Sequence, residues 1–400
     1  MGLDQYFSFC RKKATTSITL IILTALTLAS SCKSVIERQD VRPKDLRDVP
    51  ARNLAFRLEP DVSPPHLKDD TADKVQGVQT DFNTRRQDDA LIRTVVSPDG
   101  RRVLALYGTE DAPASAFRID LYSSEGQFLR NLVPPTLSCV FPQTVAWSPD
   151  GNFISFIAHR KEVPAPTPTP PASVPLPEGS PLPSPSVGPA FPPVAVFDTE
   201  QIYICNRDGY DLKPLTGREG LIYFYFLWAP DTHAVVALAC KESEWNAREK
   251  ENKLPAGRPR LIAIDGKERL LDDESTDALP VWSPDASKVA TAFDTDVVIY
   301  DAANSTPTQG KMPVREQLIA ASVAYEQRTT KKTESAAHAP VSSSPQSLPV
   351  SFNPIVRLEW AAPERLYLQT AYVRLMPNET VTTFQRWHAL HLSAQAAILK

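Results

Sequence analysis

The sequence predicts an all-β fold built from repeated four-stranded units, and three observations support this prediction. Proline is abundant, at 38 of 400 residues, whereas glycine is scarce, at 14. So much proline disfavours a mostly helical or dinucleotide-binding fold, because proline interrupts helices, and so little glycine excludes collagen. A short turn motif also recurs along the chain, and an apolar run of strand length follows each copy.

The recurring motif contains Pro-Asp or Pro-Glu and begins with Trp in four of its five copies. Its prolines are separated by 51, 81, 54 and 79 residues. Two inserts rich in Pro, Ser or Thr, residues 163–193 and 329–350, lie in the two long steps, so the underlying unit has about fifty residues. The motif residues are Pro98, Asp99, Gly100, Trp147, Pro149, Asp150, Gly151, Trp228, Pro230, Asp231, Trp282, Pro284, Asp285, Trp360 and Pro363.

Each motif precedes two apolar runs and then a polar turn with a shorter run. The first runs are residues 103–107, 153–158, 234–240, 288–293 and 365–372, and the second are 118–122, 201–205, 260–264, 297–300 and 387–392. Together with the residues before the proline, each unit supplies four strands, as one propeller blade requires. The sequence therefore predicts a β-propeller of five or six four-stranded blades over residues 91–400. A sixth blade would begin at the strand-like run 54–58.

The motif residues have mechanical roles in a turn. Proline presets φ, the Asp carboxylate accepts from a backbone N–H two residues on, and Gly takes the position with positive φ. The Trp is a large apolar plate suited to packing between neighbouring blades. We therefore expect the motif aspartates to fasten turns rather than to act as catalytic acids.

The turn Trp-Ser-Pro-Asp-Gly, the strand at 202–204, the turn at 206–209 and the segment 212–216 together resemble the TolB-type, WD40-like β-propeller repeat. The resemblance covers about residues 91–400. It implies a propeller, with six blades usual in that family and five motifs present here. TolB itself is soluble in the periplasm, so its own role is not transferred to a chain that we expect to be anchored.

Residues 1–31 have the features of a lipoprotein-type signal peptide. A positive region at 11–13 precedes an apolar run at 18–29 and small residues before Cys32. This end resembles the bacterial lipobox, which implies cleavage before Cys32 and lipidation of its thiol. An ordinary secretory signal and an uncleaved anchor are the alternatives, although 18 residues are short for about 30 Å of hydrocarbon. Every alternative predicts that the rest of the chain is exported. With the lipid anchor, we expect a membrane-anchored lipoprotein of the cell envelope that faces the periplasm or exterior.

The prediction for the remaining segments follows from composition. Residues 32–90 are charged and punctuated by proline, which predicts a flexible tether, and the inserts 163–193 and 329–350 are predicted to be disordered. In an up-and-down blade, these two inserts and the charged stretch 241–257 emerge on one face. Insertions that gather on one face of a repeat fold often mark its binding side, although they are also simply tolerated there.

Motifs for catalysis and metal binding are absent from the sequence. It contains no Gly-x-Ser-x-Gly elbow, Walker loop, HExxH or GxGxxG. Cys139, Cys205 and Cys240 lack the spacing of a zinc site and are expected to be buried thiols, although one pair could form a disulfide. His388 and His391 fall on opposite faces of a predicted strand, a poor metal pair. We expect no cofactor and no metal.

The net charge of −4 does not indicate the excess of positive charge that is typical of nucleic-acid-binding proteins. The tether, the propeller and the missing catalytic motifs together predict a non-catalytic, lipid-anchored platform that binds an envelope protein or glycan. The alternative is a periplasmic propeller-type polysaccharide lyase or hydrolase that uses carboxylates and histidine in the central channel. A purely structural envelope component is a third possibility.

Overall fold

The computed structural model describes residues 45–66, 74–109, 116–161, 193–303, 306–334, 354–374 and 382–395. The segment 1–31, Cys32 and nearly all of the insert 163–193 lie outside these residues. The chain divides into two units, Met1–Asp48 and Val49–Lys400, and the described part of the first holds the short 3-10 helix η1 (Leu46–Asp48). None of the described helices is both long and apolar enough to cross a membrane.

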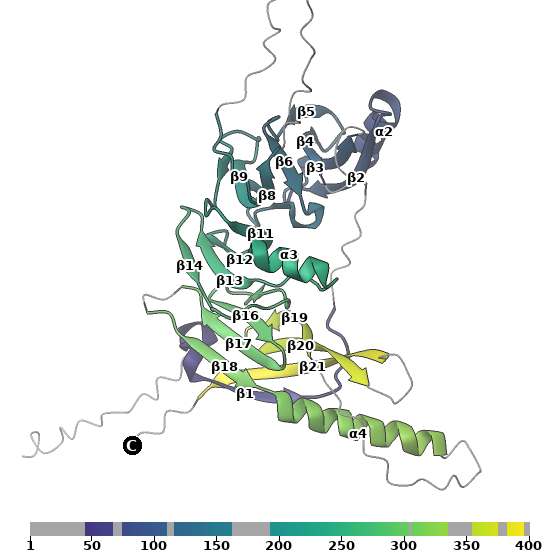
Figure 1. The fold of residues 1–400 in the computed structure, drawn as a ribbon, viewed down its shortest axis with the longest axis vertical. Coiled ribbons are helices and arrows are strands. Elements are labelled where there is room, and N and C mark those ends of the chain that lie inside the picture. The colour runs from purple at the N-terminus through teal and green to yellow at the C-terminus, as the bar shows by residue number, and fades with distance from the viewer. Residues whose placement is uncertain are drawn as a thin grey trace, which may run out of the picture. The chain divides into compact units, whose positions relative to one another are not determined.

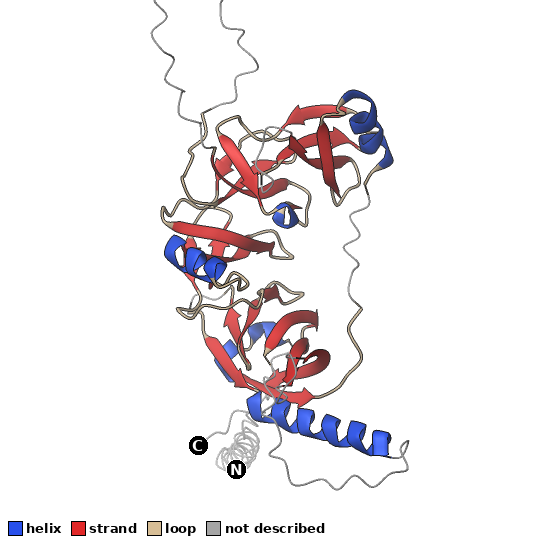
Figure 2. Ribbon diagram, turned by 45° about the vertical axis from the view of Figure 1, so that its right-hand side comes forward, coloured by secondary structure: helices blue, strands red, loops and turns tan. Residues whose placement is uncertain are grey.

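The described part of the second unit is mostly β and contains five antiparallel sheets (Figures 1 and 2). Three of them are meanders, in which strands adjacent in sequence are adjacent in the sheet. The first sheet contains β2 (Asp89–Val96), β3 (Arg102–Thr109), β4 (Arg118–Ser123) and β5 (Phe128–Asn131). The third contains β11 (Leu221–Trp228), β12 (Ala234–Lys241), β13 (Arg258–Ala263) and β14 (Glu268–Leu270). The fourth contains β15 (Val281–Trp282), β16 (Lys288–Phe293), β17 (Asp296–Asp301) and β18 (Gln309–Pro313).

The second sheet has an interrupted first strand. Its order is β10-β9-β8-β6, and β7 also pairs with β8. The break between β6 and β7 is the 3-10 helix η3 (Pro142–Thr144), which follows Phe141 at φ +59° and begins with a proline that has no N–H to donate to a ladder. The strands are β6 (Leu137–Val140), β7 (Ala146–Trp147), β8 (Phe153–Arg160), β9 (Gln201–Asn206) and β10 (Lys213–Pro214).

The fifth sheet joins the two ends of the unit. Its order is β1-β21-β20-β19, so the strand nearest the N-terminus completes a sheet made from the last strands of the chain. The pairing of β1 with β21 runs from Leu54 opposite Ala394 to Glu59 opposite Ala389. The strands are β1 (Leu54–Glu59), β19 (Ile355–Ala362), β20 (Arg365–Arg374) and β21 (Thr382–Ala394).

The predicted flexible tether over residues 32–90 needs correction where the structure describes it. The 3-10 helix η2 (Ala51–Asn53), strand β1 and the helix α2 (Gln76–Arg85) all lie within it. These elements form because a few apolar residues suffice when another part of the chain covers them: Val78 and Phe82 of α2 are buried against the first sheet. The run 54–58 is a strand, as expected, but it completes the fifth sheet instead of starting a sixth.

Two further helices overlap the predicted insertions. The charged stretch 241–257 contains α3 (Glu242–Lys250), between the second and third strands of its sheet. Helix α4 (Arg315–Glu334) follows the last strand of the fourth sheet in the sequence and precedes the strand β19 of the fifth. It includes the first six residues of the insert 329–350, which corrects the prediction of disorder for that part. The rest of that insert lies outside the described residues.

The hydrophobic core lies mainly between consecutive sheets. One group of buried side chains joins the first and second sheets, including Ile119 and Phe156, and others join the second to the third and the third to the fourth. Strand β3 is covered on both faces, by the second sheet on one face and by α2 on the other, so its residues 103–107 are buried without interruption. This explains why the predicted strands read as continuous apolar runs rather than alternating ones.

Candidate functional site

The repeated motif forms a hairpin turn that leads into the second strand of its sheet. In the first copy, Gly100 has φ +69° and its N–H donates to the carbonyl of Ser97 at 2.9 Å. The Asp99 carboxylate accepts from the Ser97 hydroxyl at 2.6 Å and from the Arg101 N–H at 3.1 Å. These hydrogen bonds lower the pKa of Asp99 to about 2, and the bond from the Ser97 hydroxyl has the largest effect.

Three other copies of the motif also hold their aspartate by hydrogen bonds within the turn. Asp150 and Asp285 accept from the hydroxyls of Ser148 and Ser283, at 2.6 Å and 2.5 Å. Asp231 has no serine two residues before it and accepts from the N–H of His233 at 3.2 Å. The aspartates of these four copies therefore all accept hydrogen bonds within their own turns, which is a structural role.

Three of the motif tryptophans connect consecutive sheets through their indole N–H groups. Trp147 donates to the Val95 carbonyl of the first sheet at 3.1 Å, and Trp228 donates to the Ser155 hydroxyl of the second at 2.7 Å. Trp282 donates to the Leu227 carbonyl of the third sheet at 3.0 Å. Trp360 differs, because its motif has one extra residue and a bulge, and it bonds within its own turn to Pro363 at 3.3 Å.

Among the described residues, the cysteines are buried and His388 is neutral. Cys139, Cys205 and Cys240 are buried and free, and burial raises the pKa of all three thiols, to about 12 for Cys205 and Cys240. Burial, with help from a nearby guanidinium, lowers the pKa of His388 to about 4, so its imidazole is neutral. Within the described ranges, no three His, Cys, Asp or Glu side chains lie close enough to hold a metal ion.

The strongest candidate for a ligand site is an open cleft of about 520 Å³ where the first sheet meets the turn between β9 and β10. The first sheet supplies strands β3, β4 and β5, and the turn comes from the second sheet. We call this site the Arg130–Tyr210 cleft. Its lining residues are Arg102, Leu121, Leu129, Arg130, Asp208 and Tyr210.

An arginine and a tyrosine form the centre of the cleft. The Arg130 guanidinium carbon lies 3.6 Å from the centroid of the Tyr210 ring, and the Tyr210 side chain is still 58% exposed. Arg130 donates to the Asp208 carbonyl at 3.4 Å, and its buried Nε–H has no acceptor in the described structure. No ion pair joins Arg130 to any described carboxylate. A stacked, partly exposed guanidinium without a counter-ion is suited to receive an anionic group.

The turn that carries Tyr210 is held tightly against the first sheet. Asn206 accepts the N–H groups of Asp208 and Tyr210 at 3.1 Å and 2.9 Å, which makes this a hairpin turn. Gly209 has φ +77°, and a Cβ there would collide with the side chain of Leu132. Glycine at this position therefore favours the approach that brings Tyr210 over Arg130.

Ion pairs fix the same turn at two more points. Arg102 contacts the Asp208 carboxylate at 3.1 Å, and Arg207 contacts Asp99 at 2.7 Å. Asp99 therefore stabilises two turns, because its carboxylate bonds within its own turn and also pairs with Arg207 in the turn between β9 and β10.

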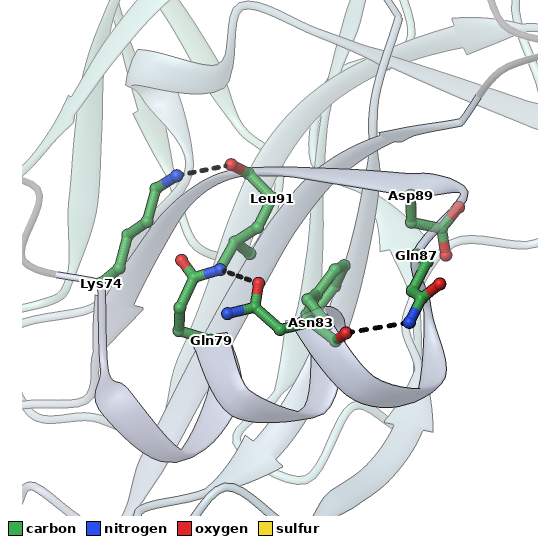
Figure 3. A pocket seen from close by; sticks show the side chains of 7 residues that line it. Lys74, Gln79, Asn83, Gln87, Asp89 and Leu91 are labelled. Atoms are coloured by element: carbon green, nitrogen blue, oxygen red, sulfur yellow. Dashed lines mark hydrogen bonds between the residues drawn. The ribbon is translucent and has the colours of Figure 1, made fainter.

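A second pocket, of about 360 Å³, lies between α2 and β2 (Figure 3). Its polar side chains largely satisfy one another: Gln79 donates to the Asn83 side chain at 2.8 Å, Gln87 to the Asn83 carbonyl at 3.3 Å, and Lys74 to the Leu91 carbonyl at 2.9 Å. The lining offers neither a stacked cation nor an exposed aromatic ring. The Arg130–Tyr210 cleft is therefore the better candidate.

Comparison with known proteins finds similarity only among solved structures. No family model matches the chain, and no curated protein matches it. It is similar to prolyl oligopeptidase B from Galerina marginata, with 10% identity, TM-score 0.42 and coverage of 84% of this chain and 42% of that one. It is also similar to an oligogalacturonate lyase in complex with manganese, with 10% identity, TM-score 0.32 and coverage of 75% and 65%. Hsv2p from Kluyveromyces lactis gives 10% identity, TM-score 0.32 and coverage of 76% and 73%.

The chain thus spans less than half of the peptidase and just under two thirds of the lyase. At these identities and TM-scores, the likeness does not transfer an activity to this chain.

Proposed function

We propose that this chain is a non-catalytic, lipid-anchored binding protein of the cell envelope, whose five-bladed β-propeller binds a carboxylate-bearing glycan in the Arg130–Tyr210 cleft. The single observation that carries the proposal is the guanidinium of Arg130, stacked on an exposed tyrosine and free of any described carboxylate partner. The lipobox-like end of residues 1–32 supports the anchor, and the five repeated sheets support the propeller.

Each part of a sugar acid has a counterpart in the cleft. The planar fork of Arg130 matches a carboxylate in geometry and charge. The apolar face of a pyranose ring fits against exposed tyrosine and leucine, which Tyr210 and Leu129 provide. The cleft volume of about 520 Å³ lies within the range of small-ligand sites.

Substitution of Arg130 by alanine should weaken binding of a defined oligogalacturonate by roughly tenfold or more, because a charge-assisted hydrogen bond contributes about 1.5–3 kcal/mol. Arg130→Lys should recover part of the loss, since it keeps the charge without the planar fork. Tyr210→Ala should weaken binding as well. Titration calorimetry on the mature protein measures all three variants.

Tyr367 provides the matched control, because it pairs with Arg365 outside the cleft. Tyr367→Ala should bind as the wild type does. Equal binding by wild type, Arg130→Ala and Tyr210→Ala would contradict the proposed site. Progressive shortening of the oligomer during the titration would instead support the lyase or hydrolase alternative.

The proposed anchor has its own test. Cys32→Ala should abolish lipidation, because the thioether bond to the diacylglyceryl group requires the thiol. Protein from a detergent-solubilised membrane fraction should show by intact mass a chain that begins at Cys32 and carries lipid. The variant should lack that mass. An unlipidated wild-type chain in the soluble fraction would contradict the anchor while leaving the cleft to be judged by the titration.

A further inference from the structure

We infer that Asp208 is a built-in competitor for the acidic group of the ligand and sets the charge selectivity of the Arg130–Tyr210 cleft. This inference rests on the proposed function. It concerns a carboxylate that lines the same cleft as two arginines and lies within one residue of the Gly209–Tyr210 corner.

Asp208 already occupies the place that a ligand carboxylate would take on Arg102. Its Oδ1 lies 3.1 Å from Arg102 Nη2, at the distance of an ordinary charged hydrogen bond. The pair is within reach of solvent, since the side chains of Arg102 and Asp208 are 32% and 48% exposed. A ligand can therefore meet this carboxylate directly.

The turn fixes the position of Asp208. Its N–H donates to the Asn206 side chain at 3.1 Å, and its carbonyl accepts from Arg130 at 3.4 Å. The backbone contact joins Asp208 to one arginine and the carboxylate joins it to the other. The backbone of Asp208 is therefore fixed at the cleft, and its carboxylate is held by the ion pair with Arg102.

The two arginines of the cleft differ in whether their charge is already paired. Arg130 is the available guanidinium, whereas Arg102 is neutralised by Asp208. A ligand with one carboxylate near Arg130 meets only the repulsion of Asp208, and a second carboxylate must displace Asp208 from Arg102. An uncharged sugar stacked on Tyr210 meets neither cost. Asp208 therefore lowers affinity for acidic chains selectively.

Asp208→Asn should bind the oligogalacturonate roughly tenfold more tightly than the wild type, with a steeper loss of affinity as salt increases, since Arg102 becomes available to a second carboxylate. Asparagine has nearly the same shape and is well tolerated in turns, so the hairpin should persist. The methyl ester of the same oligomer should bind wild type and variant equally.

Asp265→Asn is the control for charge alone. It removes one negative charge from a surface turn, where Asp265 pairs with Lys267 and does not line the cleft. Its effect on affinity should be much smaller than that of Asp208→Asn. A control melting curve for each variant shows whether the fold is intact.

The outcomes separate the inference from the function on which it rests. Unchanged affinity in Asp208→Asn, an equal gain in Asp265→Asn, or an equal gain for the methyl ester would overturn the inference. If wild type still binds and Arg130→Ala does not, the proposed function survives that result. If neither wild type nor Asp208→Asn binds the oligomer, both are overturned.

Discussion

Replacing Lys288 by methionine should lower the free energy of unfolding by about 3–5 kcal/mol, because it leaves a buried carboxylate without its cation. The side chains of Lys288 and Asp301 are 3% and 0% exposed, and their charged atoms lie 2.9 Å apart. Lys288 also donates to the Val49 carbonyl at 2.7 Å. The Asp301 carboxylate accepts the N–H of Ala51 at 3.1 Å, so this pair attaches the start of the unit to the fourth sheet.

Equilibrium denaturation in urea measures this prediction. Lys267→Met is the matched control, because its pair with Asp265 is on the surface, and it should change stability little. A loss for Lys288→Met no larger than for the control would show that the buried pair is not needed.

The same pair has a defined dependence on pH. Although burial alone would raise it, hydrogen bonds from Thr308 and Lys288 hold the pKa of Asp301 below the ordinary 3.8. A lowered carboxyl pKa stabilises the folded state above the ordinary value, and this stabilisation is lost as the pH falls through the pKa of the folded protein. Without Lys288, burial raises the pKa of Asp301 in the variant, so the variant is relieved of its penalty once this carboxyl is protonated. The difference in stability between wild type and Lys288→Met should therefore narrow as the pH falls into the acid range.

Trp228→Ala should cost about 3–5 kcal/mol of stability, because a large buried ring is replaced by a cavity. The Trp228 ring stacks on Phe153 with centroids 6.3 Å apart, and its N–H bonds the Ser155 hydroxyl in the second sheet. The substitution therefore removes both the packing and the hydrogen bond that join two sheets. Thermal and urea unfolding measure the loss.

Trp228→Phe separates these two contributions. It keeps an aromatic ring against Phe153 but removes the indole N–H, so it should cost much less than the alanine variant. Trp360→Phe removes a bond within a single turn, and its loss should be smaller still. If Trp228→Ala were as stable as the wild type, the motif tryptophans would not be the contacts that join the sheets.

The repeated turns allowed most sheets to be predicted from the sequence, because each turn and its strands are local. Pro98, Asp99 and Gly100 act within six residues, and the neighbouring apolar run is the next strand. The fifth sheet shows the limit of this approach. Residues 54–58 are a strand-like run, but residues 32–90 as a whole are charged and punctuated by proline, and the partner strand is about 330 residues away. The sequence therefore suggested a tether and did not show which sheet this strand completes.

The candidate site was less predictable for the same reason. The turn at 206–211 is recognisable as a hairpin turn from its own residues, and Tyr210 is visible in it. Its partner Arg130 belongs to another sheet, and the stacking depends on the close approach that Gly209 permits. A single sequence shows the glycine but not what approaches it.

The pairing of β1 with β21 sets an order of events in folding. Pairing β1 with β21 closes a loop of about 330 residues, and the entropy of closing a loop rises with its length. The meander of β2–β5, in contrast, has all its strands within 43 residues and pairs through local contacts, which form quickly. We therefore expect the internal sheets to form first and the two ends of the unit to join last.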